Sequence, residues 1–373
     1  APAAPAAPAA PAAPAAPAAA PLSCGAHVVE FRRGAEGELV ERLLAEGRRL
    51  WVVSDSTVAH LYGGPLVGAL QARGGDAHLV SFPAGERHKT LRALDAVAWQ
   101  CLQVGASRED LVVALGGGVT GDLAGLLAAT LLRGVRWAQV PTTLLAQVDS
   151  SVGGKVAVNH ALGKNLLGAF YPPEWAWLDA AYLDTLPPRQ LAAGCAELVK
   201  HALLGDVALL EDLEALARAP RVASALSPSL LRRGVAVKAA VVSRDERERG
   251  ERVTLNLGHT LGHALEAASR DLLHGEAVAL GLCFALERSV ARGLPPADAA
   301  RAVALLRALG LPTDWRAALS AESLDFLRRD KKRSGEQLTF VVLTALGAPA
   351  LERVGVEDLC DAARAAALRP PPF

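Results

Sequence analysis

The amino-acid sequence predicts an α/β protein in which a parallel-sheet domain is followed by a mainly α-helical domain. In the first half, short runs rich in β-branched residues alternate with longer runs of helical spacing. After about Pro188 the runs become long, rich in Ala and Leu, and helical. With 373 residues, of which 51% are hydrophobic, the chain is large enough to bury two cores.

Four buried strands are expected in the first domain. They are Arg49–Ser54, Ala77–Phe82, Asp110–Leu115 and Trp137–Val140. Between the second and the third, residues 90–104 carry apolar side chains at helical spacing. Strands and helices in alternation imply parallel strands with helices on the faces of the sheet.

The second domain is expected to contain four long helices. They are Leu191–Gly205, Leu230–Arg244, Leu257–Ser269 and Gly275–Arg292. Late in the chain, Gln337–Leu343 and Ala350–Val354 have the pattern of a β-hairpin. We therefore place an α/β domain at residues 22–188 and a mainly α-helical domain at 189–373, and we expect the active site between them.

Residues 1–21 repeat Ala-Pro-Ala and form a low-complexity segment. The fixed φ of proline and its missing amide donor favour an extended chain of polyproline II character, and the segment has nothing to bury. We expect a disordered tail outside the fold.

The composition excludes several classes of partner. The 39 basic and 39 acidic residues balance, so no global field attracts nucleic acid or an anionic membrane. No apolar run reaches the ~18 residues of a membrane span, and the early residues lack the pattern of a secretory signal. Five cysteines lie far apart without a CxxC pair, which argues against a disulfide framework and a thiolate zinc site. We expect a cytoplasmic enzyme.

A glycine-rich turn follows the third expected strand. In the run LVVALGGGVTGD, residues 111–122, three glycines separate a buried segment from a helical one. Backbone without Cβ approaches a pyrophosphate closely, and the next helix begins with free amides. Because the pattern is not GxGxxG, the turn either binds a cofactor or only reverses the chain. Asp122 either binds a hydroxyl or caps the helix.

Another turn, residues 83–89, places Glu86 and Lys89 beyond the end of the second expected strand. That position suits contact with a ligand, but a solvated surface turn is the simpler explanation.

The densest polar stretch is residues 141–165. It contains PTTLLAQVDSSVGGK, then Asn159 and the Gly-Lys-Asn of 163–165. Such a mixture of hydroxyl, amide and charged groups cannot be a packed core, because its polar groups would need partners. Hydroxyl and amide groups that orient a polyol, with lysines that hold a phosphate, explain it better than an ordinary polar loop.

Candidate metal ligands lie in the second domain. Glu197, Lys200 and His201 share one helix face, His259 and His263 are one turn apart on another helix, and His274 follows a polar break. A glutamate with two histidines suits zinc with open positions for a substrate. Spacing alone leaves open which histidines are ligands. Further cations occur at Lys238, at Arg252 and in the run Asp330-Lys-Lys332, although most basic residues belong to solvated faces.

Together these segments resemble the 3-dehydroquinate synthase family of sugar-phosphate cyclases, from about residue 50 to residue 345. The motifs GGGVTGDLAG, PTTLLAQVDSSVGGK, GKNLLGAF, AELVKH, LNLGHTLGHALE and HGEAVALG occur in the order of that family. The resemblance implies a Rossmann-like NAD domain followed by a helical metal-binding domain, assembled as a homodimer.

The resemblance also implies a role for individual residues. The NAD site would be lined by Asp55, Glu86, Lys89, Gly117, Gly118, Asp122, Thr142, Thr143, Lys164 and Thr185. Zinc, with cobalt as an alternative, would be held by Glu197, His259 and His274. Catalytic roles would fall to Lys155, Lys200, Lys238, Asn256 and His263. Substrate contacts would come from Arg133, Asp149, Asn165, Arg252 and one of Lys331 and Lys332.

The substrate implied by the resemblance is a small anionic sugar acid, 3-deoxy-D-arabino-heptulosonate 7-phosphate. Transient oxidation by NAD, elimination of phosphate, re-reduction and an intramolecular aldol closure would convert it to 3-dehydroquinate, a step of the shikimate pathway. The competing hypotheses are another sugar-phosphate cyclase, a metal-dependent polyol dehydrogenase, and a degenerate relative that only binds a nucleotide. Net consumption of NAD distinguishes the dehydrogenase from a cyclase.

Overall fold

The computed structural model describes residues 18–248, 250–269, 271–331 and 337–370. Most of the expected tail, residues 1–17, lies outside the described residues, and so does Lys332. Lys331 is the last residue of a described helix.

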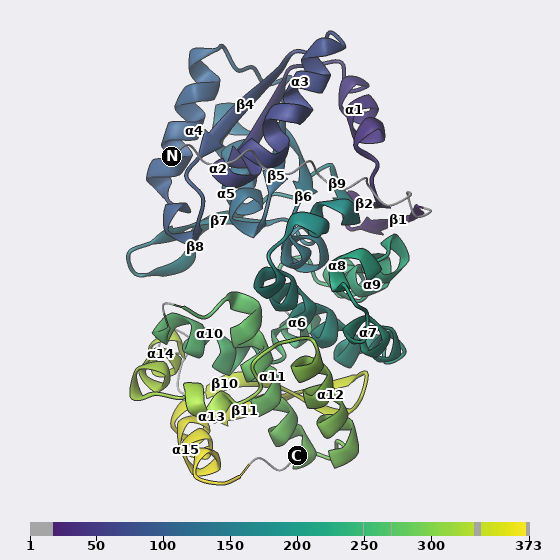
Figure 1. Ribbon diagram of the computed structural model, residues 1–373. Helices are drawn as coiled ribbons and strands as arrows, with labels where there is room; N and C mark the ends of the chain where they lie inside the picture. Colours follow the sequence, from purple (N-terminus) through teal and green to yellow (C-terminus); the bar gives the residue numbers. More distant parts are fainter. Residues whose placement is uncertain (1–17, 249, 270, 332–336, 371–373) are drawn as a thin grey trace, which may run out of the picture.

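A seven-stranded sheet forms the centre of the first domain (Figure 1). In spatial order its strands are β1 (Ala19–Cys24), β2 (His27–Arg32), β9 (Trp175–Asp179), β6 (Arg136–Pro141), β5 (Leu111–Gly116), β3 (Leu50–Asp55) and β4 (Ala77–Phe82). All neighbouring pairs are parallel except β1 and β2, which are antiparallel. The four strands expected from the sequence are present, each end within one residue of its expected position.

Strand β1 includes Ala19–Pro21, which composition alone assigns to the tail. Its pairing with β2 shifts register between Ala19 and Leu22, so Pro21 lies where a missing amide donor costs no ladder hydrogen bond. The guanidinium of Arg232 donates to the carbonyl of Ala20 at 2.9 Å and ties this strand to the second domain.

Alternate residues of the central strands face opposite layers of helices. Leu50 and Val52 pack with helices α1 (Glu36–Leu44) and α3 (Gly64–Ala72) on one face. Trp51 and Val53 pack with α4 (Leu91–Gln103) and α5 (Gly118–Thr130) on the other. After β3 the chain crosses one face of the sheet through α3 to reach β4, on one side of β3. After β5 it crosses the other face through α5 to reach β6, in the opposite direction along the sheet. The carboxyl ends of β3 and β5 therefore form the topological switch point, where open α/β sheets bind their ligands.

The polar stretch of residues 141–165 forms a π-helical turn, Ala146–Ser150, and most of a β-hairpin. The hairpin consists of β7 (Lys155–His160) and β8 (Gly163–Phe170) and was not expected from the sequence. It lies on α5, where a Cβ on Gly125 would come within 2.3 Å of Val156. Figure 1 shows the hairpin extending from the sheet domain toward the second domain.

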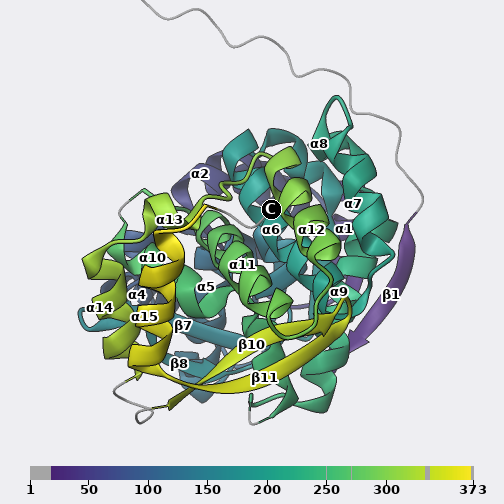
Figure 2. The same cartoon turned by 90° about the horizontal axis from the view of Figure 1, so that it is seen from below.

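The second domain is mainly helical. Its helices are α6 (Pro188–Gly205), α7 (Leu209–Ala217), α8 (Val222–Ala225), α9 (Pro228–Arg244), α10 (His259–Ala268), α11 (His274–Val290), α12 (Pro296–Ala308), α13 (Trp315–Ala318), α14 (Ala321–Lys331) and α15 (Val356–Ala367). The expected late hairpin is present as β10 (Gln337–Ala345) and β11 (Ala348–Gly355), and it crosses α11 in Figure 2.

One hydrophobic cluster joins the two domains. Phe31 of β2 and Leu178 of β9 belong to the same cluster as Leu198 of α6 and Val235 of α9. All five cysteines are free and buried. Among the described residues, no helix combines the length and the apolar character that a bilayer span requires.

Candidate active site

The glycine turn lies at the switch point. Asp55 ends β3 and accepts hydrogen bonds from the amides of Thr57 and Val58 at 3.0 and 3.2 Å. Thr120 of α5 donates to the other oxygen of Asp55 at 3.3 Å. A Cβ on Gly116 would lie 2.4 Å from the Thr120 hydroxyl, so only glycine fits there. Asp55 and the start of α5 thus border one crevice.

The segment after β6 closes the other side of the glycine turn. The amide of Thr142 donates to the carbonyl of Gly116 at 3.0 Å. A Cβ on Gly117 would be 3.1 Å from Thr143, and one on Gly118 would be 3.1 Å from Ser150. The expected cofactor residues of the glycine turn and of the segment after β6 therefore meet at one edge of the sheet. They lie around Gly117 and Gly118, whose backbone carries no side chain.

A buried lysine connects two other expected residues. Lys89 forms an ion pair with Asp122 of α5 and donates to the amide oxygen of Asn165 at 2.5 Å. Beside it, Asn159 donates to the carboxylate of Glu86 at 2.7 Å. The turn after β4, helix α5 and the β7–β8 hairpin thus share one polar network, and the turn is not a solvated one.

Glu197, His259 and His274 converge across three helices of the second domain. The imidazole Nε2 atoms of His259 and His274 lie 3.4 and 3.5 Å from the Glu197 Oε1 atom. Their Nδ1 atoms face the carbonyl of Leu257 at 3.1 Å and the carboxylate of Glu266 at 3.0 Å, so the Nε2 atoms point to Glu197. The three side chains therefore present one oxygen and two nitrogens to a common centre.

This group fits a divalent metal ion. Glu197 is fully buried, and neither of its oxygens has a hydrogen bond among the described residues. Ligand atoms about 2.0–2.1 Å from a tetrahedral zinc lie roughly 3.3 Å apart, close to the separations found here. Burial opposes ionisation of Glu197, yet Lys200 and His259 hold its pKa well below the usual range. Lys200 forms an ion pair with the Oε2 atom of Glu197, so the Oε1 atom, which faces the two histidine nitrogens, is the oxygen that a cation could use.

His263 lies beside these ligands on helix α10. Its ring centroid is 5.1 Å from that of His259 and 5.8 Å from that of His274. Unlike them it faces no part of Glu197 and is exposed. The ligand atoms of all three histidines nevertheless lie within 4.8 Å of one another, so His263 could also contact an ion bound here.

A second acidic group, Asp149 with Glu197 and His201, is a poorer metal site. The Lys238 ammonium donates to Asp149 at 2.8 Å, and the Lys200 ammonium lies 3.7 Å from the same oxygen. Burial alone would raise the pKa of Asp149, but Lys238 keeps it below the usual range. Two ammonium groups already pair with these two carboxylates, so the arrangement is a buried cluster of ion pairs next to His259 and His274.

A third group of cations borders the hairpin. Lys155 forms an ion pair with Glu248, which also accepts from Asn256 at 3.1 Å. The buried Arg252 contacts the carbonyl of Gly153 at 3.4 Å. Glu248 was not expected from the sequence, because it belongs to the charged run at 244–252, which is typical of a solvated loop. Glu266 was likewise missed, since nothing in its spacing indicates that it reaches His274.

Other expected residues lie apart from these groups. Thr185 is exposed after β9, where its hydroxyl is 2.5 Å from that of Tyr62. Lys331 ends α14, and Lys332 lies outside the described residues. Arg133 is exposed in the turn before β6, at the amino edge of the sheet. The glycine turn lies at the carboxyl edge, so the structure does not bring Arg133 to the other residues.

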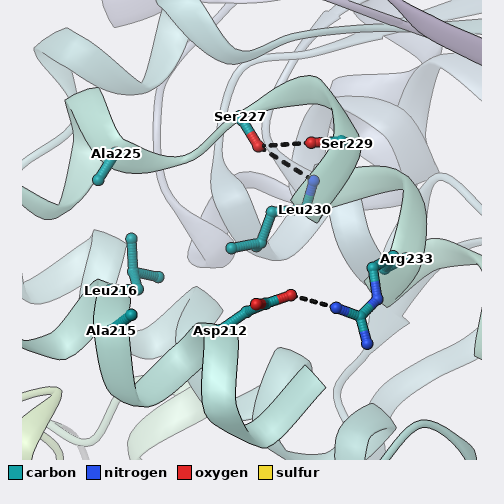
Figure 3. Close-up of a pocket in the computed structure, with 8 residues that line it drawn as sticks. All are labelled: Asp212, Ala215, Leu216, Ala225, Ser227, Ser229, Leu230 and Arg233. Atoms are coloured by element: carbon teal, nitrogen blue, oxygen red, sulfur yellow. Dashed lines mark hydrogen bonds and ion pairs between the residues drawn. The ribbon is translucent and has the colours of Figure 1, made fainter. Parts of the chain in front are cut away.

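A pocket of about 350 Å³ lies between α7, α8 and α9 (Figure 3). Its charged residues, Asp212 and Arg233, form an ion pair with each other, and Ser227 contacts Ser229 at 2.9 Å. None of the expected site residues lines this pocket. With its charges satisfied internally, the pocket lacks the chemistry of the metal and cation groups described above.

Comparisons with known proteins identify the family of this chain. The model of the 3-dehydroquinate synthase N-terminal family matches residues 79–193, and the C-terminal model matches residues 194–333. The 3-dehydroquinate synthase of Gloeobacter violaceus is 45% identical over 308 residues, which cover 82% of this chain and 85% of the relative.

Two solved structures of cyclases share the fold. A 2-epi-5-epi-valiolone synthase from Streptomyces hygroscopicus with NAD+ and Zn2+ bound has a TM-score of 0.80 and 26% identity, and covers 94% of this chain and 99% of its own. A 2-deoxy-scyllo-inosose synthase complexed with carbaglucose-6-phosphate, NAD+ and Co2+ has a TM-score of 0.76 and 27% identity, with 93% and 99% covered.

Proposed function

This chain belongs to the 3-dehydroquinate synthase family, and from that premise we propose that it converts 3-deoxy-D-arabino-heptulosonate 7-phosphate to 3-dehydroquinate and phosphate. The observation that carries this proposal is the place where Glu197, His259 and His274 meet. They lie in the helical domain beside the buried ammonium group of Lys200, which contacts both Glu197 and Asp149. The enzyme is an NAD- and metal-dependent lyase.

The chain's own residues account for most of the steps. When bound, NAD supplies reversible hydride transfer, and zinc or cobalt supplies polarisation of the hydroxyl that is oxidised. We propose that Glu197, His259 and His274 hold the metal. Lys89 and Asp122, near the glycine turn, would hold NAD.

The anionic groups of the substrate need cations. Lys200 and Lys238 are buried and face Asp149, while Lys155 begins β7 and Arg252 contacts the carbonyl of Gly153 just before that strand. We propose that these residues neutralise the carboxylate and phosphate, and that Asn256 and Asn165 orient hydroxyls. His263 would move the proton at the carbon beside the oxidised centre, because its ring stands next to the ligand rings without facing Glu197.

We also propose a homodimer. The resemblance assigns Arg133 to the substrate, but the turn that carries Arg133 lies at the amino edge of the sheet, away from the glycine turn of the same chain. In a two-fold dimer, Arg133 could instead reach the site of the partner subunit. Helix α4 supports an interface there. Its Trp99 is 61% exposed, and Leu102 and Val104 are each 50% exposed. The loop that follows contacts the Arg133 turn through Arg108, which donates to the carbonyl of Leu132.

A cytoplasmic location and a domain boundary near residue 188 are also part of the proposal. The boundary is supported by the change from one family model to the next at residues 193 and 194.

The decisive assay follows phosphate and NADH together, with the heptulosonate phosphate and a small amount of NAD. A cyclase returns the hydride within each turnover, so phosphate should exceed the cofactor many times over without a lasting rise in NADH absorbance. Permanent NADH formation in proportion to product would contradict the proposal and favour the polyol dehydrogenase. Phosphate release from another sugar phosphate, but not from this one, would favour a different cyclase.

A further inference from the structure

The carboxylate of Glu266, on helix α10, divides its two oxygens between two different partners. Its Oε2 atom lies 3.0 Å from Nδ1 of His274, and its Oε1 atom accepts from the Lys164 ammonium at 2.5 Å. The side chain is 12% exposed. Both oxygens of Glu266 are therefore engaged, one by the His274 ring and the other by the Lys164 ammonium.

One partner belongs to the metal group. The other nitrogen of His274 is 3.5 Å from Glu197 Oε1. A carboxylate that accepts from Nδ1 fixes the tautomer and the orientation of the ring, and it raises the basicity of Nε2. Glu266 thus determines how well His274 can serve as a ligand.

The other partner belongs to the sheet domain. Lys164 lies on β8, and its side chain is 51% exposed. The next residue, Asn165, accepts from Lys89, which is ion-paired with Asp122 below the glycine turn. The contact between Lys164 and Glu266 spans 102 positions of the sequence and connects the hairpin of the cofactor side to the helix of the metal side.

We infer that Glu266 is a positioning residue that couples metal binding to cofactor binding. The inference rests on the proposed function, because it takes the glycine turn as the NAD site. A dinucleotide pyrophosphate near β8 competes for the Lys164 ammonium. As Lys164 shares its charge with the phosphates, Glu266 becomes a stronger acceptor for His274, and the His274 Nε2 atom becomes a better metal ligand. Each ligand then strengthens the binding of the other by the same factor.

The test measures the dissociation constant of zinc by competition with a chelator, with and without saturating NAD+. The full chain is compared with Glu266→Gln, Lys164→Gln and Glu276→Gln. Glu276 is the matched control, since it lies two residues after His274, is also 12% exposed, and forms an ion pair with Arg189. It does not contact the His274 ring. Thermal unfolding of each variant checks that it is folded.

NAD+ should tighten zinc binding by the full chain by roughly tenfold, and zinc should tighten NAD+ binding equally. Glu266→Gln should weaken zinc binding by about tenfold or more and remove the response to NAD+. Lys164→Gln should bind zinc tightly even without NAD+ and lose the response, whereas Glu276→Gln should behave as the full chain does.

Unchanged zinc affinity in Glu266→Gln, an equal loss in Glu276→Gln, or no effect of NAD+ on the full chain would overturn the inference. These outcomes leave the proposed function intact as long as the full chain binds NAD+ and zinc and releases phosphate. A full chain that binds neither would instead contradict the proposed function.

Discussion

Lys200 is the most enclosed cation of the candidate site. It is 2% exposed and lies between Glu197, with which it forms an ion pair, and Asp149 at 3.7 Å. Burial opposes its charge, but the two carboxylates raise the pKa of Lys200 above the usual value. The ammonium is therefore a fixed positive charge beside the metal ligands, placed to meet an anionic substrate.

Lys200→Ala should slow phosphate release at least a hundredfold, roughly the cost of removing a preorganised charge from a site of this kind. The dissociation constant of NAD+, measured by calorimetry, should change little, because Lys89 and Lys164 lie elsewhere. Arg33→Ala is a suitable control, since Arg33 is also a buried cation, paired with Asp184 away from the site. It should lower stability but leave the turnover of the folded fraction unchanged. Equal turnover in Lys200→Ala and the parent chain would exclude the assigned role.

His27 illustrates a buried residue with a stability role. It is 2% exposed on β2, and its Nε2 atom has no hydrogen bond among the described residues. Burial lowers the pKa of His27 to about 4 from 6.5. At a pH between 4 and 6.5, His27 is therefore protonated in the unfolded chain but neutral in the folded chain. The free energy of unfolding therefore falls as the pH drops from 6.5 toward 4.

His27→Gln should flatten this pH dependence. Between about pH 7 and pH 5, the parent chain should lose about 2 kcal/mol more of its unfolding free energy than the variant does. Denaturant unfolding across that range measures the difference. The exposed His60 provides the control, and His60→Gln should retain the slope of the parent chain.

At the scale of single residues, sequence reasoning succeeded where one element carries the pattern. Helical spacing placed Glu197 and Lys200 on one face of α6, and the structure brings them together. Spacing could not choose among the three histidines, because that choice depends on how α10 packs against α11 and how α11 packs against α6. Glu248 and Glu266 were not predicted, because the sequence does not distinguish an acidic residue that is solvated from one that contacts the other domain.

Helices α10 and α11 approach each other through glycine. A Cβ on Gly281 would lie 1.8 Å from the carbonyl oxygen of Gly258, and one on Gly262 would lie 2.8 Å from the carbonyl oxygen of Ala277. Gly258 itself has φ 78° and immediately precedes His259. Close contact of the two backbones thus sets the positions of His259 and His274 relative to each other.

Gly281→Ala should therefore destabilise the protein by about 3 kcal/mol or more, because the added methyl group overlaps backbone that cannot move aside. It should also weaken zinc binding, since the overlap displaces the residue before His259. Gly68→Ala on α3 is the matched control. Its Cβ would meet nothing within 4 Å, and it should be neutral or stabilise by up to ~1 kcal/mol. Denaturant unfolding and zinc titration of both variants test this, and a Gly281→Ala protein as stable as Gly68→Ala would refute it.

At the scale of elements, the buried strands and the long helices were predictable, because each has a single strong period. Strand β9 was not, although all five of its residues are buried, because its sequence WAWLD is short and ends in a charge. The β7–β8 hairpin was not predictable either, because its many polar residues interrupt the alternation that indicates a strand. The residues of β8 alternate between exposed and partly buried only from Leu166 onward, so the first half carries no strand pattern.

The whole molecule combines two domains that share one hydrophobic core. Phe31 and Leu178 of the sheet pack in the same cluster as Leu198 of α6. The composition predicts a division of the chain but gives no sign of the shared core, because contacts between distant segments leave no periodic signal. A common core lets the Lys164–Glu266 contact form between domains that are held in register.

The proposed dimer makes a prediction that only the assembled molecule can test. Arg133→Ala and Lys200→Ala should each be nearly inactive alone. When the two are unfolded together and reassembled, half of the dimers are mixed, and each mixed dimer should contain one site with both residues intact. About a quarter of the parent activity should therefore return. A mixture that stays inactive, or a chain that sediments as a monomer while fully active, would contradict an Arg133 that acts in the partner.

The buried carboxylate of Glu197 has a consequence for the life of the protein in a cell. A chain folded without metal must hold this charge in its interior with Lys200 and the two histidine rings alone, so metal binding should add directly to stability. The melting temperature should rise with free zinc and fall with a chelator, and Glu197→Ala should abolish this response together with bound metal and activity. A variant that still holds one zinc per chain would exclude Glu197 as a ligand. The folded fraction of this enzyme would then report the zinc supply, and scarcity of the metal would appear as loss of the protein itself.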